Sequence, residues 1–161
     1  MVYKLHNMRT VLLLLFVGSS SILFAQKGVL TLQGRVENQK VRIPNVVIEV
    51  YKDNELFLTD STERNGVYKV DLDLGSVYNV SFKKKGYVRK SIAVVGQSEK
   101  IEQGRYFFQL DIELFRLDQE GLDHSVLPPA AMLYLVDDKT GFAYDKRYVK
   151  WISGEYRDLD D

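Results

Sequence analysis

The sequence predicts an all-β protein, an antiparallel sandwich of seven strands followed by a C-terminal hairpin and a short helix. Apolar residues recur at every second position in successive short runs, the spacing that places them on one face of a strand. Turn-forming residues separate these runs at intervals of about eight to twelve residues, which favours a sandwich over strands alternating with helices. Two sheets packed about 10 Å apart require one apolar and one polar face on each strand, and the runs supply both.

The seven strands are expected over residues 29–37, 45–53, 55–62, 67–74, 77–83, 87–95 and 105–117. In the run over 67–74, Tyr68, Val70 and Leu72 alternate with polar neighbours. In the last run, the apolar residues from Phe108 to Leu114 fall on one face. Each run therefore offers a face for a buried core.

Tight turns are expected at Asp53 and Asn54 and at Asn65 and Gly66, because Asn and Gly tolerate the positive backbone φ of short hairpins. Gly75 and Gly86 would likewise let the chain turn without a side-chain clash. No glycine pattern typical of phosphate binding at a helix start accompanies them.

The chain divides into a signal peptide over 1–25, a sandwich over 27–117 and an extension over 118–161. The extension begins with a polar connector that ends at Pro128 and Pro129, which cannot donate ladder hydrogen bonds. A hairpin of residues 130–136 and 142–145 follows, then one helical turn and a tail expected to be disordered. Whether this extension packs on the sandwich stays open.

Residues 1–25 have the features of a removable export signal. Lys4 and Arg9 precede an apolar centre over 11–17, which is shorter than the roughly 20 residues that span a bilayer. We expect cleavage after Ala25, with Met8 as an alternative start, and an uncleaved anchor or a buried core helix as the competing interpretation.

The composition of the chain restricts the cellular compartment and the classes of partner that we expect. The signal removes two of the 22 basic residues and none of the 22 acidic ones, so the mature chain has no bulk attraction to nucleic acid or to membrane surfaces. The chain has no cysteine, which excludes disulfides, thiolate metal sites and thiol nucleophiles. Export without disulfides favours the periplasm or outer surface of a Gram-negative bacterium, with no integral span in the mature chain.

An ordered set of short motifs resembles the carboxypeptidase regulatory-like domain over residues 30–116. The motifs are Gly34 and Val36, 43–50, Thr59, 65–68, 74–82 and 84–87. The resemblance implies a transthyretin-like (immunoglobulin-like) sandwich of about seven strands, common in exported bacterial proteins. It also implies a spacer, docking or ligand-contact module without catalytic residues, and it leaves the last 45 residues without support.

The run from 83 to 90 concentrates positive charge around one aromatic ring. Its members, Lys83, Lys84, Lys85, Tyr87, Arg89 and Lys90, form the candidate partner contact. Such a patch can bind an acidic protein surface or a lipid phosphate. The competing interpretation is that these lysines protect an edge strand from pairing with another chain.

The sequence predicts no catalytic, cofactor or metal site. His124 is the one histidine beyond the signal, and consecutive residues 123–125 point in different directions, so neither a multi-histidine zinc site nor a hydrolase triad is expected. Carboxylates on one strand face at 71 and 73, and at 111 and 113, could hold Ca²⁺ if loops added ligands.

The leading hypothesis is a non-enzymatic module of the cell envelope that docks on a protein partner through a sheet edge or the C-terminal hairpin. Alternatives are a Ca²⁺ module or a carbohydrate-binding module that uses exposed rings among Tyr106, Phe107, Phe115, Tyr134, Tyr144, Tyr148 and Trp151. A transthyretin-like hydrolase rests on Tyr156 and Arg157 alone, because Asp158 stands where that family has glycine. A small outer-membrane barrel ranks last, since the chain ends in acidic residues.

Overall fold

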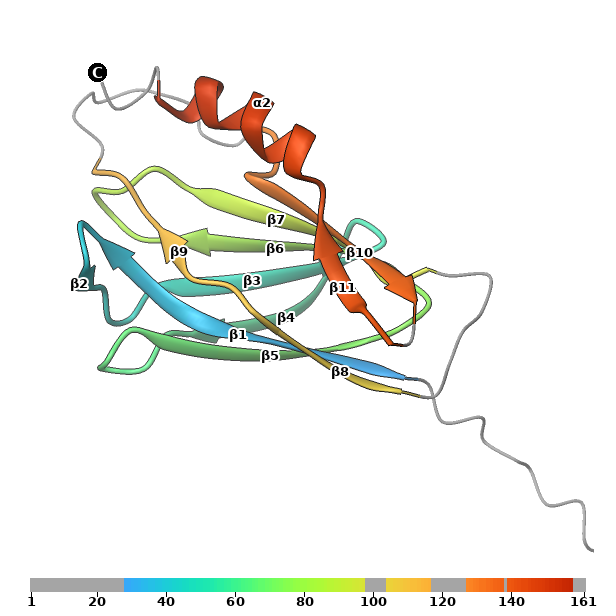
Figure 1. Cartoon of the computed structure of the whole chain (residues 1–161). Coiled ribbons are helices and arrows are strands. Elements are labelled where there is room, and N and C mark those ends of the chain that lie inside the picture. Colours follow the sequence, from blue (N-terminus) through green and yellow to red (C-terminus); the bar gives the residue numbers. More distant parts are fainter. Residues whose placement is uncertain (1–27, 98–103, 117–126, 138, 158–161) are drawn as a thin grey trace, which may run out of the picture.

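The computed structural model describes residues 28–97, 104–116, 127–137 and 139–157, which form two β-sheets packed face to face, with one helix (Figure 1). The predicted all-β sandwich with a C-terminal hairpin and helix is therefore confirmed. The predicted signal peptide, most of the connector, His124 and the acidic tail lie outside the described residues. Within the described residues, no helix is long and apolar enough to cross a membrane.

The first sheet is organised around β1 (Val29–Asn38). On one side, β1 pairs antiparallel with β5 (Val67–Asp73), and near its end it also pairs with the two-residue β2 (Val41–Arg42). On the other side, β8 (Arg105–Gln109) and β9 (Ile112–Glu113) run parallel to it.

The second sheet has six strands in the order β11-β10-β7-β6-β3-β4. Their bounds are β3 Val47–Lys52, β4 Glu55–Ser61, β6 Val77–Lys83, β7 Lys90–Val95, β10 Ala131–Asp137 and β11 Gly141–Tyr144. Strand β10 pairs parallel with β7, which joins the C-terminal hairpin to the sandwich. The question left open by the sequence is thus decided, since the hairpin extends this sheet.

Both sheets are mixed, whereas the sequence predicted antiparallel pairing throughout. The two parallel contacts, β1 with β8 and β9 and β7 with β10, join strands that are far apart in the chain or separated by a long connection. A tight hairpin forces its two strands to be antiparallel, but a long connection leaves the direction free. Sequence alternation reports the faces of a strand and carries no information on this direction.

The core lies between the sheets, and the alternating apolar residues of the strands are the ones buried in it. Its largest fully buried side chains include Tyr78, Phe82, Leu30, Leu32, Ile48, Leu72, Leu74, Leu114 and Leu133. In β5 the even positions are buried and the outer odd positions are exposed or half-buried, and an edge-to-face contact between Tyr68 and Phe82 joins the two layers. Burial of such apolar area is the main stabilising term for a domain without disulfides.

The single strand predicted over 105–117 is interrupted at Leu110 and Asp111. There the Asp111 carboxylate accepts a hydrogen bond from the backbone N–H of Arg35 at 2.9 Å, where a regular ladder would use a carbonyl. Pairing resumes in β9 without a change of register, because Gln33 is opposite Gln109 and Val36 is opposite Ile112. The interruption is therefore local, and β8 and β9 pair with β1 in the same register on either side of it.

The helix α2 (Lys146–Arg157) is longer than the single turn predicted. Asp145 caps its start, because its carboxylate accepts the backbone N–H groups of Arg147 at 2.8 Å and Tyr148 at 3.2 Å. These two hydrogen bonds hold the pKa of Asp145 below its usual value. Ile152 is buried against Val88, so the helix packs onto the sandwich beside β7.

The predicted turns adopt the backbone conformations that their residues favour. Asp53 and Asn54 have φ values of 49° and 71°, and Gly66 has a φ of 73°. The turn at Gly66 closes with a backbone hydrogen bond of 2.9 Å to the carbonyl of Glu63. The turn at Asp53 and Asn54 forms the hairpin between β3 and β4. The hairpin predicted at Asn65 and Gly66 is wrong, because that turn leads from β4 in the second sheet to β5 in the first.

Candidate functional site: a basic surface with two cavities

Six basic side chains gather at the end of the sandwich that carries β2 and the connection from β6 to β7, on the left of Figure 1. We call this the basic surface, and it consists of Arg42, Lys83, Lys84, Lys85, Arg89 and Arg116 around Tyr87. Arg42 belongs to β2, Arg116 follows β9, and the others lie at or after the end of β6. Three segments distant in sequence therefore build one site.

The connection between β6 and β7 is held in a defined conformation. Gly86 has a φ of 82°, and the backbone N–H of Tyr87 donates to the carbonyl of Lys84 at 3.1 Å. Tyr87 then forms an isolated antiparallel bridge with Arg116, and the N–H of Val88 donates to the carbonyl of Phe115 at 2.9 Å. This bridge brings Arg116 beside the predicted basic run.

The first cavity has a volume of about 660 Å³ and opens between β2 and Tyr87. Arg42, Lys84 and Arg116 supply its positive charge. Its other lining residues are Asn38, Gln39, Val41, Ile43, Pro44 and Tyr87. The volume lies within the range of small-molecule and peptide side-chain sites.

The second cavity has a volume of about 460 Å³ and shares Lys84 and Tyr87 with the first. Its lining is completed by Asn45, Val47, Lys83, Lys85 and Arg89. Lys84 is held at the boundary, because its ammonium donates to the carbonyl oxygens of Pro44 at 2.9 Å and Asn45 at 3.2 Å. Lys84 and Tyr87 thus form a ridge between the two cavities.

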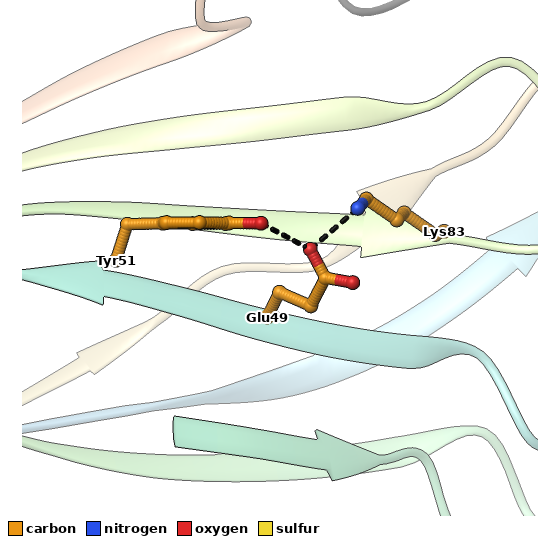
Figure 2. Close-up of polar contacts among 3 residues, drawn as sticks. All are labelled: Glu49, Tyr51 and Lys83. Carbon is orange, nitrogen blue, oxygen red and sulfur yellow. Dashed lines mark hydrogen bonds and ion pairs between the residues drawn. The ribbon is translucent and has the colours of Figure 1, made fainter. Parts of the chain in front are cut away.

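Glu49 places a negative charge at the border of the basic surface (Figure 2). Its carboxylate accepts hydrogen bonds from the Lys83 ammonium and from the Tyr51 hydroxyl, the latter at 2.6 Å. The bond from Lys83 is the main reason that the pKa of Glu49 lies below its usual value, and the bond to Glu49 raises the pKa of Tyr51. Lys83 is therefore charge-paired within the protein.

The predicted contact residues are only partly brought together. Lys83, Lys84, Lys85, Tyr87 and Arg89 line the two cavities. Lys90 does not, because its ammonium lies 3.9 Å from the centre of the Phe115 ring in a cation–π contact.

Sequence reasoning missed Arg42 and Arg116, the two basic residues that complete the first cavity. Neither lies in a charge run, and only the pairing of β2 with β1 and the bridge at Tyr87 bring them to the site. No local signal in the sequence marks them.

The alternative that these lysines protect a sheet edge is wrong. Strand β6 lies between β3 and β7, and β7 lies between β6 and β10, so both are interior strands of the second sheet. The edge strands of that sheet are β4 and β11. A charge at the end of an interior strand cannot block edge pairing.

Three of the four carboxylates that could hold Ca²⁺ make hydrogen bonds within the fold. Asp71 accepts from the Thr31 hydroxyl at 2.6 Å, and Glu113 accepts from the backbone N–H of Gln39 at 3.2 Å. Asp111 accepts from Arg35, as described above. Among the described residues, no group of three or more His, Cys, Asp or Glu side chains is arranged to hold a metal ion.

The aromatic residues that could bind a sugar make no coplanar pair among the ring contacts of the described residues. Tyr106 is buried and meets Phe142 edge to face, while Phe107 is 69% exposed on β8. Tyr148 and Trp151 are neighbours on α2, but their rings are inclined by 59°. Tyr156 and Arg157 belong to α2, and their side chains are not described.

Comparison with known proteins yields distant structural similarity only. No family model matches the chain, and no curated protein matches it. The TIE protein of Bacillus anthracis has a TM-score of 0.44 and 16% identity over 55% of this chain and 18% of that protein. A DUF3823 family protein from Parabacteroides merdae has a TM-score of 0.38 and 17% identity over 55% of this chain and 48% of its own.

Catechol 1,2-dioxygenase from Acinetobacter has a TM-score of 0.41 and 13% identity over 69% of this chain and 58% of that enzyme. The chain spans less than two thirds of the length of each of these three proteins. At such TM-scores and identities, the similarities carry no argument about activity or partners.

Proposed function

We propose that this protein is an exported, non-catalytic module of the bacterial cell envelope that docks on an acidic surface of another protein. The observation that carries the proposal is the basic surface, where six cationic side chains from three segments converge on Tyr87 and two cavities. We further propose that the module is related to the carboxypeptidase regulatory-like domain, whose motifs supply Tyr87 and the lysines before it.

Electrostatics supports docking as the use of this surface. Like charges at one end of a small domain repel one another. Glu49 pairs with Lys83, and two backbone carbonyls accept hydrogen bonds from Lys84. Arg42 of β2 and Arg116, which follows β9, line the same cavity, and β2 and β9 both pair with β1. An acidic partner would remove this repulsion and would be attracted during encounter.

A non-catalytic role is supported by how the acidic side chains are used. Asp71, Asp111 and Glu113 accept hydrogen bonds that join neighbouring strands of the first sheet. Glu49 is held by Lys83 and Tyr51. A carboxylate that stabilises the fold in this way is a poor candidate for proton transfer to a substrate.

The test is capture of a partner by the immobilised mature protein from envelope extract. The variant Arg42→Glu/Arg116→Glu reverses two charges of the first cavity, and Lys139→Glu/Lys150→Glu is the matched control at exposed positions outside the basic surface. We expect the parent and the control to retain the same acidic protein, released by high salt, and the first variant to lose it. Equal capture by all three proteins would contradict the proposal.

A further inference from the structure

We infer that the basic surface binds an extended peptide segment of its partner, in which carboxylates flank an apolar side chain. This inference rests on the proposed docking function and specifies the ligand of the same site. It depends on three observations: two adjacent cavities, exposed valines inside the charged lining, and a fixed ridge between them.

The two cavities favour an extended ligand. The cavities have volumes of about 660 Å³ and about 460 Å³, each large enough to admit a ligand side chain, and both are bounded by Lys84 and Tyr87. In an extended chain, side chains leave alternately and recur on one face at every second residue. Such a chain crossing the ridge can place one side chain in each cavity, whereas a single small anion would occupy only one.

Exposed apolar residues inside the cavities indicate that charge is only part of the recognition. Val41 is 70% exposed in the first cavity, and Val47 is 40% exposed in the second. Both valines lie among cationic side chains, so a purely ionic ligand would leave them in water. A ligand leucine that entered the first cavity would bury Val41, at about 25 cal/mol for each Å² covered.

Lys84 makes the ridge a defined element of the site. Two of its three N–H donors are directed at the carbonyl oxygens of Pro44 and Asn45, so the ammonium keeps its position and at most one donor remains for a ligand. Lys85 and Arg89 on one side, and Arg42 and Arg116 on the other, supply positive charge around it. Positive charge in both cavities, with an exposed valine beside it, matches a ligand in which carboxylates flank an apolar residue.

The test uses fluorescence anisotropy with three labelled pentapeptides and the mature protein at low salt. The first peptide has two aspartates on each side of a leucine, the second replaces leucine by serine, and the third replaces the aspartates by lysines. We expect the leucine peptide to bind about fivefold more tightly than the serine peptide, and the lysine peptide not to bind.

Two substitutions separate the charge from the apolar contact. Arg116→Gln should weaken both acidic peptides about fivefold. Val41→Ser should weaken the leucine peptide alone and so remove the difference between the two. Lys150→Gln and Val136→Ser, at exposed positions on α2 and β10, are the matched controls and should change neither affinity. Far-UV circular dichroism of each variant verifies the fold.

Equal binding of the leucine and serine peptides would overturn the inference, and so would equal competition by inorganic phosphate or by phosphatidylglycerol vesicles. Failure of both acidic peptides, with partner capture still dependent on Arg42 and Arg116, would refute the peptide ligand and leave the docking function intact. If partner capture did not depend on Arg42 and Arg116, both the peptide ligand and the docking function would be refuted.

Discussion

Gly34 of β1 lies so close to Leu110 that a β-carbon built on the glycine would be 2.0 Å from the Leu110 carbonyl oxygen. The same carbonyl accepts a hydrogen bond from the buried Tyr68 hydroxyl at 2.7 Å, although the two residues are 42 positions apart. Leu110 also donates its own N–H to the carbonyl of Gln33 at 2.9 Å. The backbone of Leu110 therefore contacts both β1 and the Tyr68 side chain of β5, and only glycine at position 34 leaves room for it.

Replacing Gly34 by alanine should destabilise the protein by about 3 kcal/mol, because the new methyl group would meet backbone atoms, which cannot rotate away. The matched control is Gly154→Ala in α2, where nothing lies within 4 Å of the added atom. That change should stabilise the helix by about 0.5 kcal/mol. Urea unfolding of both variants measures the difference, and similar stabilities would show that the contact is not tight.

Removing the Tyr68 hydroxyl by Tyr68→Phe should cost about 1–2 kcal/mol at pH 7, because the Leu110 carbonyl loses its buried donor. Burial, and to a lesser extent the charge of Asp111, raises the pKa of Tyr68 above its usual 10.0. The folded state therefore favours the neutral phenol, and this contribution to stability is lost as the pH rises beyond about 10.

Unfolding at alkaline pH, monitored by tyrosine absorbance, tests the direction of this pH dependence of stability. The parent should lose stability more steeply than Tyr68→Phe above pH 10, and the two curves should converge. Tyr134→Phe, which alters a ring that is 40% exposed, should behave like the parent. Parallel curves for the parent and Tyr68→Phe would contradict the buried environment of this hydroxyl.

The hydrogen bonds of Glu49 should make the stability of the protein depend on pH in the acid range, in the direction opposite to that of Tyr68. Its pKa is lowered by Lys83 and Tyr51, so the charged form stabilises the folded state above the usual pKa of 4.5, and this stabilisation disappears as the pH falls below that value. Glu49→Gln should lower the free energy of unfolding by about 0.5–1 kcal/mol at pH 7 and by almost nothing at pH 3. Urea titrations at the two pH values provide the measurement, and a constant difference would refute the coupling.

The C-terminal hairpin should unfold together with the sandwich. Leu133 of β10 is fully buried and opposite Val94 of β7, so Leu133→Ala should cost about 3 kcal/mol. Trp151 on α2 is the one tryptophan in the chain, so its fluorescence reports the extension while far-UV circular dichroism reports the sheets. Coincident transitions that shift together in the variant are expected. A separate early fluorescence transition would instead identify an independent extension.

Local patterns in the sequence were sufficient for the elements themselves. Alternation at β5 and β6 correctly predicted which residues face the core, and Asp53, Asn54 and Gly66 correctly marked the turns. The helix was underestimated, because the cap at Asp145 and the burial of Ile152 lengthen it beyond one turn. The alternation could not show the interruption at Leu110, where the Asp111 carboxylate accepts from Arg35 of β1 and the Tyr68 hydroxyl of β5 donates to the Leu110 carbonyl.

The sequence by itself determined that this is a two-layer β protein, because period-two burial and turn propensity act between residues close in the chain. Tertiary structure alone decided the parallel pairings of β1 with β8 and of β7 with β10. It also decided the site, since Arg42 and Arg116 reach Tyr87 only through long-range pairing. Strand direction and long-range neighbours depend on how distant segments close their loops, and no local spacing of residues encodes that choice.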